Sequence, residues 1–163
     1  MWSIYQMDKM KVHPDFADFV NLLNLAKVEY VIVGAYALAY HGQPRATGDI
    51  DFWIRPKHEN ASLLLAALER FGFGSLDLSI DDVLSGKIIQ LGFPPVRIDI
   101  ITRLDGLDED EVWGSKSQGT LGNNNVWYLS REAFIKNKRA SGRHKDLADL
   151  ELLGEEIDPK NNH

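Results

Sequence analysis

The chain has 163 residues, of which 44% are hydrophobic and 26% charged, and its formal net charge is −6. This length and composition predict one domain with a sizeable core. Because the sequence contains no cysteine, disulfides and thiolate metal sites are excluded, and any metal must be held by oxygen or imidazole. The negative charge argues against a protein that coats nucleic acid indiscriminately.

Hydropathy and charge run unevenly along the chain. No run reaches the roughly 18 apolar residues of a membrane span, and residues 1–12 lack an apolar run of signal-peptide length. We therefore expect a cytoplasmic protein that does not associate with membranes. Acids cluster between Asp105 and Glu111, whereas residues 131–146 contain six bases against two acids, about +4. That basic segment is suited to an anionic ligand.

The predicted elements begin with a helix that opens at Pro14 and carries hydrophobic residues at helical spacing to Ala26. The β-branched run Tyr30–Val33 predicts a buried strand, and a short helix over Ala35–His41 is expected to follow. After a loop over 43–48, the alternating segment Asp49–Ile54 predicts a second strand.

The second half of the chain predicts further elements, ending in two helices and a tail. The hydrophobic spacing predicts helices over Asn60–Phe71 and from the cap Ser79 to Leu84. Strands are expected at Ile88–Leu91, Val96–Ile101 and Val126–Leu129, with the first two joined as a hairpin. The acidic block and the stretch Gly114–Asn125 are expected to form a long irregular connection. Two helices follow, over residues 131 to about 140 and 145 to about 153.

This order of elements predicts an α/β or α+β domain in which helices back a mixed sheet. We expect a core over residues 1–129, C-terminal helices over 130–153 packed on that core, and a flexible tail over 154–163.

Three aspartates interrupt strands that are otherwise suited to a core. Asp49 and Asp51 lie two residues apart, so their carboxylates emerge on one face of the strand. Asp99 is framed by isoleucines in the same way, on a strand that is a candidate neighbour. Because adjacent carboxylates repel unless a cation lies between them, the pattern indicates a site for Mg²⁺ or Mn²⁺. Two such ions can clamp both oxygens of a phosphoryl displacement.

A second feature lies just upstream, where Gly34 ends one strand and a helix begins. A strand–glycine–helix junction presents free backbone N–H groups, which suits a triphosphate. Two neighbouring residues have plainer interpretations: Trp53 shares the face of Asp51, but core packing is favoured over stacking on a base, and His41 suits a helix C-terminus.

Taken in order, these features resemble the nucleotidyltransferase superfamily with its polymerase-beta-like core. That superfamily has a hydrophobic strand, a Gly-Gly or Gly-Ser pair, a short helix, Asp-x-Asp and a later strand acid. The chain is similar to small bacterial nucleotidyltransferases of abortive-infection and toxin–antitoxin systems, which add an Arg-x-Thr loop and a basic tail. The resemblance covers residues 30–153, and the positions that carry it are Gly34, Arg45, Thr47, Asp49, Asp51, Asp99 and the tail over 138–149.

The resemblance implies a reaction and a set of roles. A nucleoside monophosphate passes from an NTP such as ATP to an acceptor hydroxyl, and pyrophosphate is released. Asp49, Asp51 and Asp99 hold the metal ions, and Asp99 also serves as general base. The implied nucleotide-binding residues are Gly34, Ala35, Arg45, Thr47, and Lys138 or Lys145. The acceptor stays open among tRNA, a protein and a small molecule, and a toxin–antitoxin partner protein is a further expectation.

Two positions depart from the pattern of the superfamily. Ala35 replaces the Gly or Ser that commonly follows the first glycine, and Gly48 stands where close relatives often have a lysine. One alternative is therefore a catalytically degenerate module that binds nucleotide or a partner protein. The other is an unrelated α+β domain in which the acids only cap helices and form salt bridges.

Overall fold

A six-stranded mixed sheet organises the computed structural model, which describes residues 12–43, 48–73, 76–93 and 96–156. The strand order is β3-β4-β2-β1-β6-β5. The strands are β1 (Tyr30–Val33), β2 (Asp49–Ile54), β3 (Ile89–Phe93), β4 (Val96–Ile101), β5 (Ser117–Leu121) and β6 (Asn124–Tyr128). The mixed sheet predicted from the order of elements is confirmed.

The two central strands determine the architecture of this sheet. Strand β1 pairs antiparallel with β2 and parallel with β6, and β2 pairs parallel with β4. The antiparallel hairpins β3–β4 and β5–β6 form its two edges. The predicted hairpin between Ile88 and Ile101 is therefore confirmed, although its turn over 94–95 lies outside the described residues.

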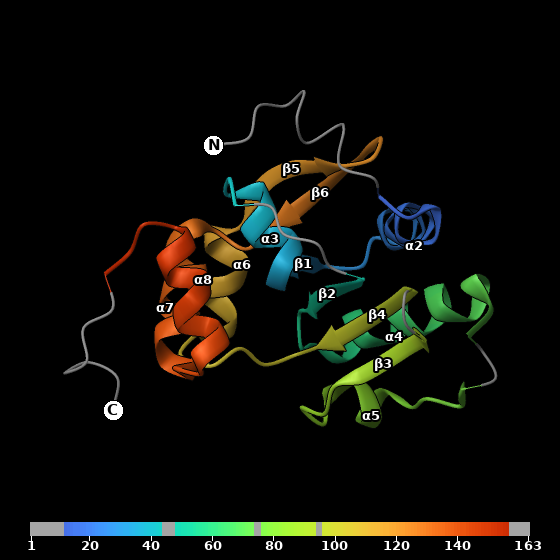
Figure 1. Ribbon diagram of the computed structural model, residues 1–163. Helices are drawn as coiled ribbons and strands as arrows, with labels where there is room; N and C mark the ends of the chain where they lie inside the picture. The colour runs from blue at the N-terminus through green and yellow to red at the C-terminus, as the bar shows by residue number, and fades with distance from the viewer. Residues whose placement is uncertain (1–11, 44–47, 74–75, 94–95, 157–163) are drawn as a thin grey trace.

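Helices surround the sheet in two main groups (Figure 1). The helices α6, α7 and α8 pack together at one side, whereas α4 and α5 accompany the β3–β4 end. The helices are α2 (Pro14–Leu25), α3 (Gly34–Tyr40), α4 (His58–Leu68), a π-helical turn η1 (Glu69–Phe73), α5 (Ile80–Leu84), α6 (Glu109–Ser115), α7 (Arg131–Ser141) and α8 (His144–Leu152). Within the described residues, no helix is long and apolar enough to cross a membrane.

The alternation of β2 divides its side chains between core and site. Ile50, Phe52 and Ile54 are fully buried, and the Phe52 ring meets Phe19 of α2 at 5.2 Å between centroids. Trp53 is only 1% exposed, which confirms its expected place in the core. The carboxylates of Asp49 and Asp51 leave the strand on the opposite face from Phe52 and keep partial exposure.

The acidic block is not the irregular connection that its charge predicted. Its last acids begin helix α6, because the Asp108 carboxylate caps the helix by accepting a hydrogen bond from the Glu111 amide at 2.8 Å, and the Glu111 carboxylate accepts one from the Asp108 amide. Acids in a first turn also interact favourably with the helix dipole. Glu109 and Glu111 then pair with Arg55 and Lys136, so the charges stabilise local structure instead of remaining solvated.

The stretch Gly114–Asn125 was also wrongly predicted to be irregular. It contains β5 and the start of β6, which pair from Ser117 to Leu121 in a hairpin. The two residues at the turn are Gly122, with φ of +60°, and Asn123. Gly-Asn between two strands is a hairpin signal, so turn chemistry outweighed the polar composition of this segment.

Candidate active site

Parallel pairing of β2 with β4 brings the three strand aspartates together. Asp51 lies directly opposite Asp99 in the register, and Asp49 lies opposite Arg97. All four side chains project from the same face because each pair is separated by two residues along its strand. We call Asp49, Asp51 and Asp99 the carboxylate cluster. The prediction that the two strands are neighbours is confirmed.

The environment of Asp51 shows the electrostatic cost of this arrangement. Burial, together with the neighbouring carboxyls of Asp99 and Asp49, raises the pKa of Asp51 to about 6, and Lys138 offsets only part of the rise. Like charges that cannot separate favour the protonated form of one of them. Asp51 is therefore the member of the cluster whose ionised form is disfavoured.

Arg97 contacts the carboxylate cluster, although the sequence did not indicate it. Its Nη2 donates to Asp49 Oδ2 at 2.7 Å and to Asp99 Oδ2 at 3.2 Å, and its Nε donates to Asp99 Oδ1 at 3.0 Å. The guanidinium thus joins an acid of β2 to an acid of β4. A signal was present, since Arg97 precedes Asp99 by two residues and must share its face.

Gly34 approaches this cluster from β1. Val33 lies opposite Asp51 in the antiparallel pair, and Gly34 follows with φ of +66°. A Cβ added at Gly34 would collide with the Asp51 carboxylate, so both the backbone conformation and the space require glycine. The junction predicted between β1 and the next helix is confirmed, with α3 beginning at Gly34 itself.

The carboxylate cluster opens into a cleft of about 660 Å³. Acids on the sheet face bases that come mainly from the C-terminal helices. The cleft is lined by Gly34, Ala35, Asp49, Asp51 and Asp99 at the sheet, by Arg103 and Asp105 after β4, and by Asn137, Lys138, Ser141, Arg143 and Lys145 of the C-terminal helices and the turn between them. A volume of this size is typical of small-molecule sites.

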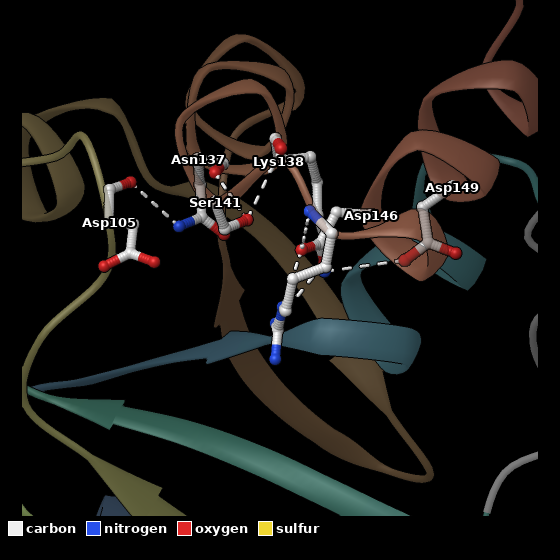
Figure 2. A network of polar contacts seen from close by, with 7 residues as sticks. Asp105, Asn137, Lys138, Ser141, Asp146 and Asp149 are labelled. Carbon is white, nitrogen blue, oxygen red and sulfur yellow. Dashed lines mark hydrogen bonds and ion pairs between the residues drawn. The ribbon is translucent and has the colours of Figure 1, made fainter. Parts of the chain in front are cut away.

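Lys138 belongs to a buried network between α7 and α8 (Figure 2). Its Nζ lies 3.1 Å from Asp146 Oδ1 and 3.4 Å from Asp149 Oδ2, and neither aspartate is more than 2% exposed. Arg143 Nε donates to Asp146 Oδ2 at 2.8 Å. We call these four residues the helix network. Burial acts to raise the pKa of Asp146, but hydrogen bonds from Arg143, Ser141 and Lys138 outweigh it and hold the pKa at about 2.

Most of the predicted site residues meet in this cleft. Gly34, Ala35, the carboxylate cluster, Lys138 and Lys145 all line it. Arg45 and Thr47, the predicted phosphate neighbours, lie outside the described residues. Lys138 is tied to two aspartates, whereas Lys145 is exposed and, among the described residues, pairs with no acid. Arg143 belongs to the basic segment that was expected to meet an anionic ligand, whereas Arg103, like Arg97, was not indicated by the sequence.

The donor set fits a hard divalent cation. Three carboxylates on adjacent strands supply the oxygen ligands that Mg²⁺ and Mn²⁺ prefer, and the raised pKa of Asp51 shows that a cation would relieve their repulsion. Within the described ranges, however, no three acids or histidines are already arranged to hold a metal ion. The guanidinium of Arg97 spans two of the three carboxylates.

Comparison with solved structures identifies the fold. The chain is similar to the solution structure of the antibiotic-resistance factor ANT(2'')-Ia, with a TM-score of 0.55, 16% identity, and coverage of 85% of this chain and 80% of that one. It is also similar to the lincosamide antibiotic adenylyltransferase LnuA in its lincomycin-bound crystal structure, with a TM-score of 0.51, 16% identity, and coverage of 88% and 96%. No protein-family model and no protein of curated function matches the sequence. The similarity shows the fold, and the predicted nucleotidyltransferase fold is confirmed.

Proposed function

We propose that this protein is a metal-dependent nucleotidyltransferase that moves a nucleoside monophosphate from an NTP to an acceptor hydroxyl. One observation carries the proposal: Asp51 and Asp99 are register partners on parallel strands, beside Asp49, at the floor of a cleft whose opposite wall is basic. Acids that hold a cation and bases that hold phosphate are the two requirements of phosphoryl transfer.

The carboxylate cluster would hold Mg²⁺ or Mn²⁺, which supplies charge neutralisation to the triphosphate and lowers the pKa of the attacking hydroxyl. Lys145 would bind the β- and γ-phosphates from the wall. Lys145 suits this role better than Lys138, because the helix network already engages the Lys138 ammonium. The backbone amides at Gly34 and Ala35 line the cleft beside Asp51 and would contact the triphosphate.

The chemical step balances with these residues alone as acid and base. The acceptor oxygen bonds to the α-phosphorus, and the bond from that phosphorus to the bridging β-oxygen breaks, so pyrophosphate leaves. Asp99 would take the proton of the acceptor hydroxyl, since its side chain reaches the cleft from the strand next to Asp51.

A small molecule is the acceptor that we propose, in preference to RNA or a protein. The chain is acidic overall, with a net charge of −6, and its cleft has the volume of a small-molecule site. LnuA, which has a similar fold, is a lincosamide antibiotic adenylyltransferase. The relationship to toxin–antitoxin nucleotidyltransferases remains a prediction from the sequence pattern. Binding of this chain to a partner protein would support that relationship.

The proposal is tested with NTPs labelled at the α-phosphate, incubated with Mg²⁺ and separate pools of small hydroxylated metabolites and antibiotics, RNA, and protein. Label should enter the small-molecule pool with release of one pyrophosphate per transfer, and Asp99→Asn should slow this transfer strongly. Nucleotide binding with no pyrophosphate release in any pool would instead identify the degenerate binding module. If neither nucleotide nor metal binds, the three aspartates have only a structural role and the proposed function is wrong.

A further inference from the structure

We propose that Arg97 and a divalent cation compete for Asp49 and Asp99, so that Arg97 is the internal counter-ion of the carboxylate cluster. This inference rests on the proposed function, because it concerns the same metal site. It goes further by assigning to one residue the control of how tightly metal binds.

The first step is geometric. Arg97 takes both carboxylate oxygens of Asp99, at 3.0 and 3.2 Å, and one oxygen of Asp49 at 2.7 Å. A planar guanidinium matches a carboxylate in this two-point manner, which a lysine ammonium cannot do. One side chain therefore occupies carboxylate oxygens on both strands, and these are the groups that would hold a cation.

The second step is electrostatic. The guanidinium is within hydrogen-bonding distance of Asp49 and Asp99, so it would repel a cation held by the same carboxylates, and such repulsion is strong in a partly buried site. The Arg97 side chain is 27% exposed, so it has solvent into which it can rotate. When a divalent cation binds, we therefore expect the guanidinium of Arg97 to leave Asp49 and Asp99, so that a double positive charge replaces a single one at these carboxylates.

The third step distinguishes competition from support. A residue that merely positioned the carboxylates would strengthen metal binding, and its removal would weaken it. A competitor has the opposite sign, and its removal would tighten metal binding. Occupation of three ligand oxygens by Arg97 favours competition over support.

The chain supplies a matched control in Arg55. It also joins two carboxylates, Glu29 at 2.7 Å and Glu109 at 2.8 Å, and it is similarly shielded from solvent. Its partners are not members of the carboxylate cluster. Arg55→Gln therefore removes an equivalent pair of ion pairs at a site where no metal is expected.

The experiment measures Mn²⁺ affinity by titration of free Mn²⁺ with electron paramagnetic resonance, for the full chain and the variants Arg97→Gln, Arg97→Lys and Arg55→Gln. Thermal melting in EDTA verifies folding. We expect Arg97→Gln to lower the Kd for Mn²⁺ by about tenfold or more, because the repelling charge is gone. Arg97→Lys should lower it by about threefold, since the point charge holds fewer oxygens. Arg55→Gln should leave it unchanged.

The outcomes separate this inference from the proposed function. If the parent protein binds Mn²⁺ and both Arg97 variants bind it equally or more weakly, the proposed competition between Arg97 and the metal is wrong. The proposed metal site would still be supported in that case. Arg97→Lys keeps the test valid if Arg97→Gln fails to fold. If neither the parent nor the variants bind Mn²⁺, with or without NTP, the proposed function is wrong. The proposed competition between Arg97 and the metal is then wrong as well.

Discussion

Two groups of aspartates in this molecule have opposite electrostatic surroundings. In the carboxylate cluster, burial and two neighbouring acids raise the pKa of Asp51 to about 6. In the helix network, hydrogen bonds from Arg143, Ser141 and Lys138 outweigh burial and hold the pKa of Asp146 at about 2. The residue type is the same and both groups are shielded from water, so the difference lies in how many donors face each carboxylate.

The comparison teaches how structural and functional acids can be told apart. The helix network satisfies its charges internally, which is what holds α8 against α7. The carboxylate cluster brings three acids together, two of which pair with Arg97, and it opens into a cleft. A cluster that costs folding free energy and faces a cavity indicates a ligand that completes it.

The largest effect should come from breaking the helix network. Asp146→Asn leaves the buried Lys138 without a full counter-charge, and loss of one partner of a buried pair typically costs about 3–5 kcal/mol. We expect urea unfolding to show a decrease of that size. Arg139→Gln is the control, because its pair with Glu155 is exposed and should be worth under about 1 kcal/mol. Equal losses in the two variants would contradict the structural role of the network.

Next in size is the loss of the general base. Asp99→Asn should lower turnover by about 10²-fold or more, since the acceptor proton loses its destination. NTP affinity should fall much less, because Asp49 and Asp51 remain. Single-turnover kinetics beside equilibrium NTP binding will separate the two quantities. Turnover like that of the parent protein would remove Asp99 from the mechanism.

A smaller effect is expected from relieving the repulsion in the cluster. A folded pKa above the unfolded value means that stability falls as pH rises from about 4 to 6, where Asp51 ionises in the folded protein. In EDTA at pH 7.5, Asp51→Asn should therefore be more stable than the parent by about 2–3 kcal/mol. This gain should vanish near pH 4. Urea unfolding at the two pH values measures it.

The same substitution has a second readout in the presence of metal. Mg²⁺ should raise the melting temperature of the parent protein by ligand linkage, and Asp51→Asn should lose this rise. A variant that is clearly less stable than the parent in EDTA would show that Asp51 is structural, and the two groups of aspartates would then not differ in kind.

The smallest effect concerns the basic wall. Lys145→Ala should weaken NTP binding about tenfold, as expected for one charge-assisted hydrogen bond. Lys136→Ala is the control, since Lys136 lies on α7 but pairs with Glu111 outside the cleft. Calorimetric titration at two salt concentrations compares them. If Lys138→Ala weakens NTP binding while Lys145→Ala does not, the helix network has a direct role in binding, and the contrast between the two groups becomes less sharp.

Sequence reasoning predicted the parts of the fold in which local pattern and tertiary environment agree. The alternation over Asp49–Ile54 defined both the buried and the acidic face of β2, and the hydrophobic frame of Asp99 did the same for β4. It failed at α6 and β5, where composition indicated a loop. A capping box at Asp108 and a two-residue turn at Gly122 determined those elements instead.

The parts of the site that depend on register could not be predicted. The contact of Arg97 with Asp49 joins residues on two strands whose parallel alignment is set by packing over the whole sheet. The attachment of Lys138 to Asp149 likewise requires the angle between α7 and α8. Sequence spacing identified the chemical groups, but which charge meets which carboxylate is a property of the assembled sheet and helices.

Parallel pairing of β2 with β4 also fixes the order in which the cleft is assembled during protein synthesis. Asp51 meets Asp99 only after the segment between the two strands has left the ribosome, and the bases of α7 and α8 follow later. Arg97 emerges just ahead of Asp99, so a cation arrives together with the acid that it neutralises. A nascent chain halted before α7 would contain the acidic floor without the basic wall. We expect such a chain to expose its carboxylates to metal but to retain no nucleotide.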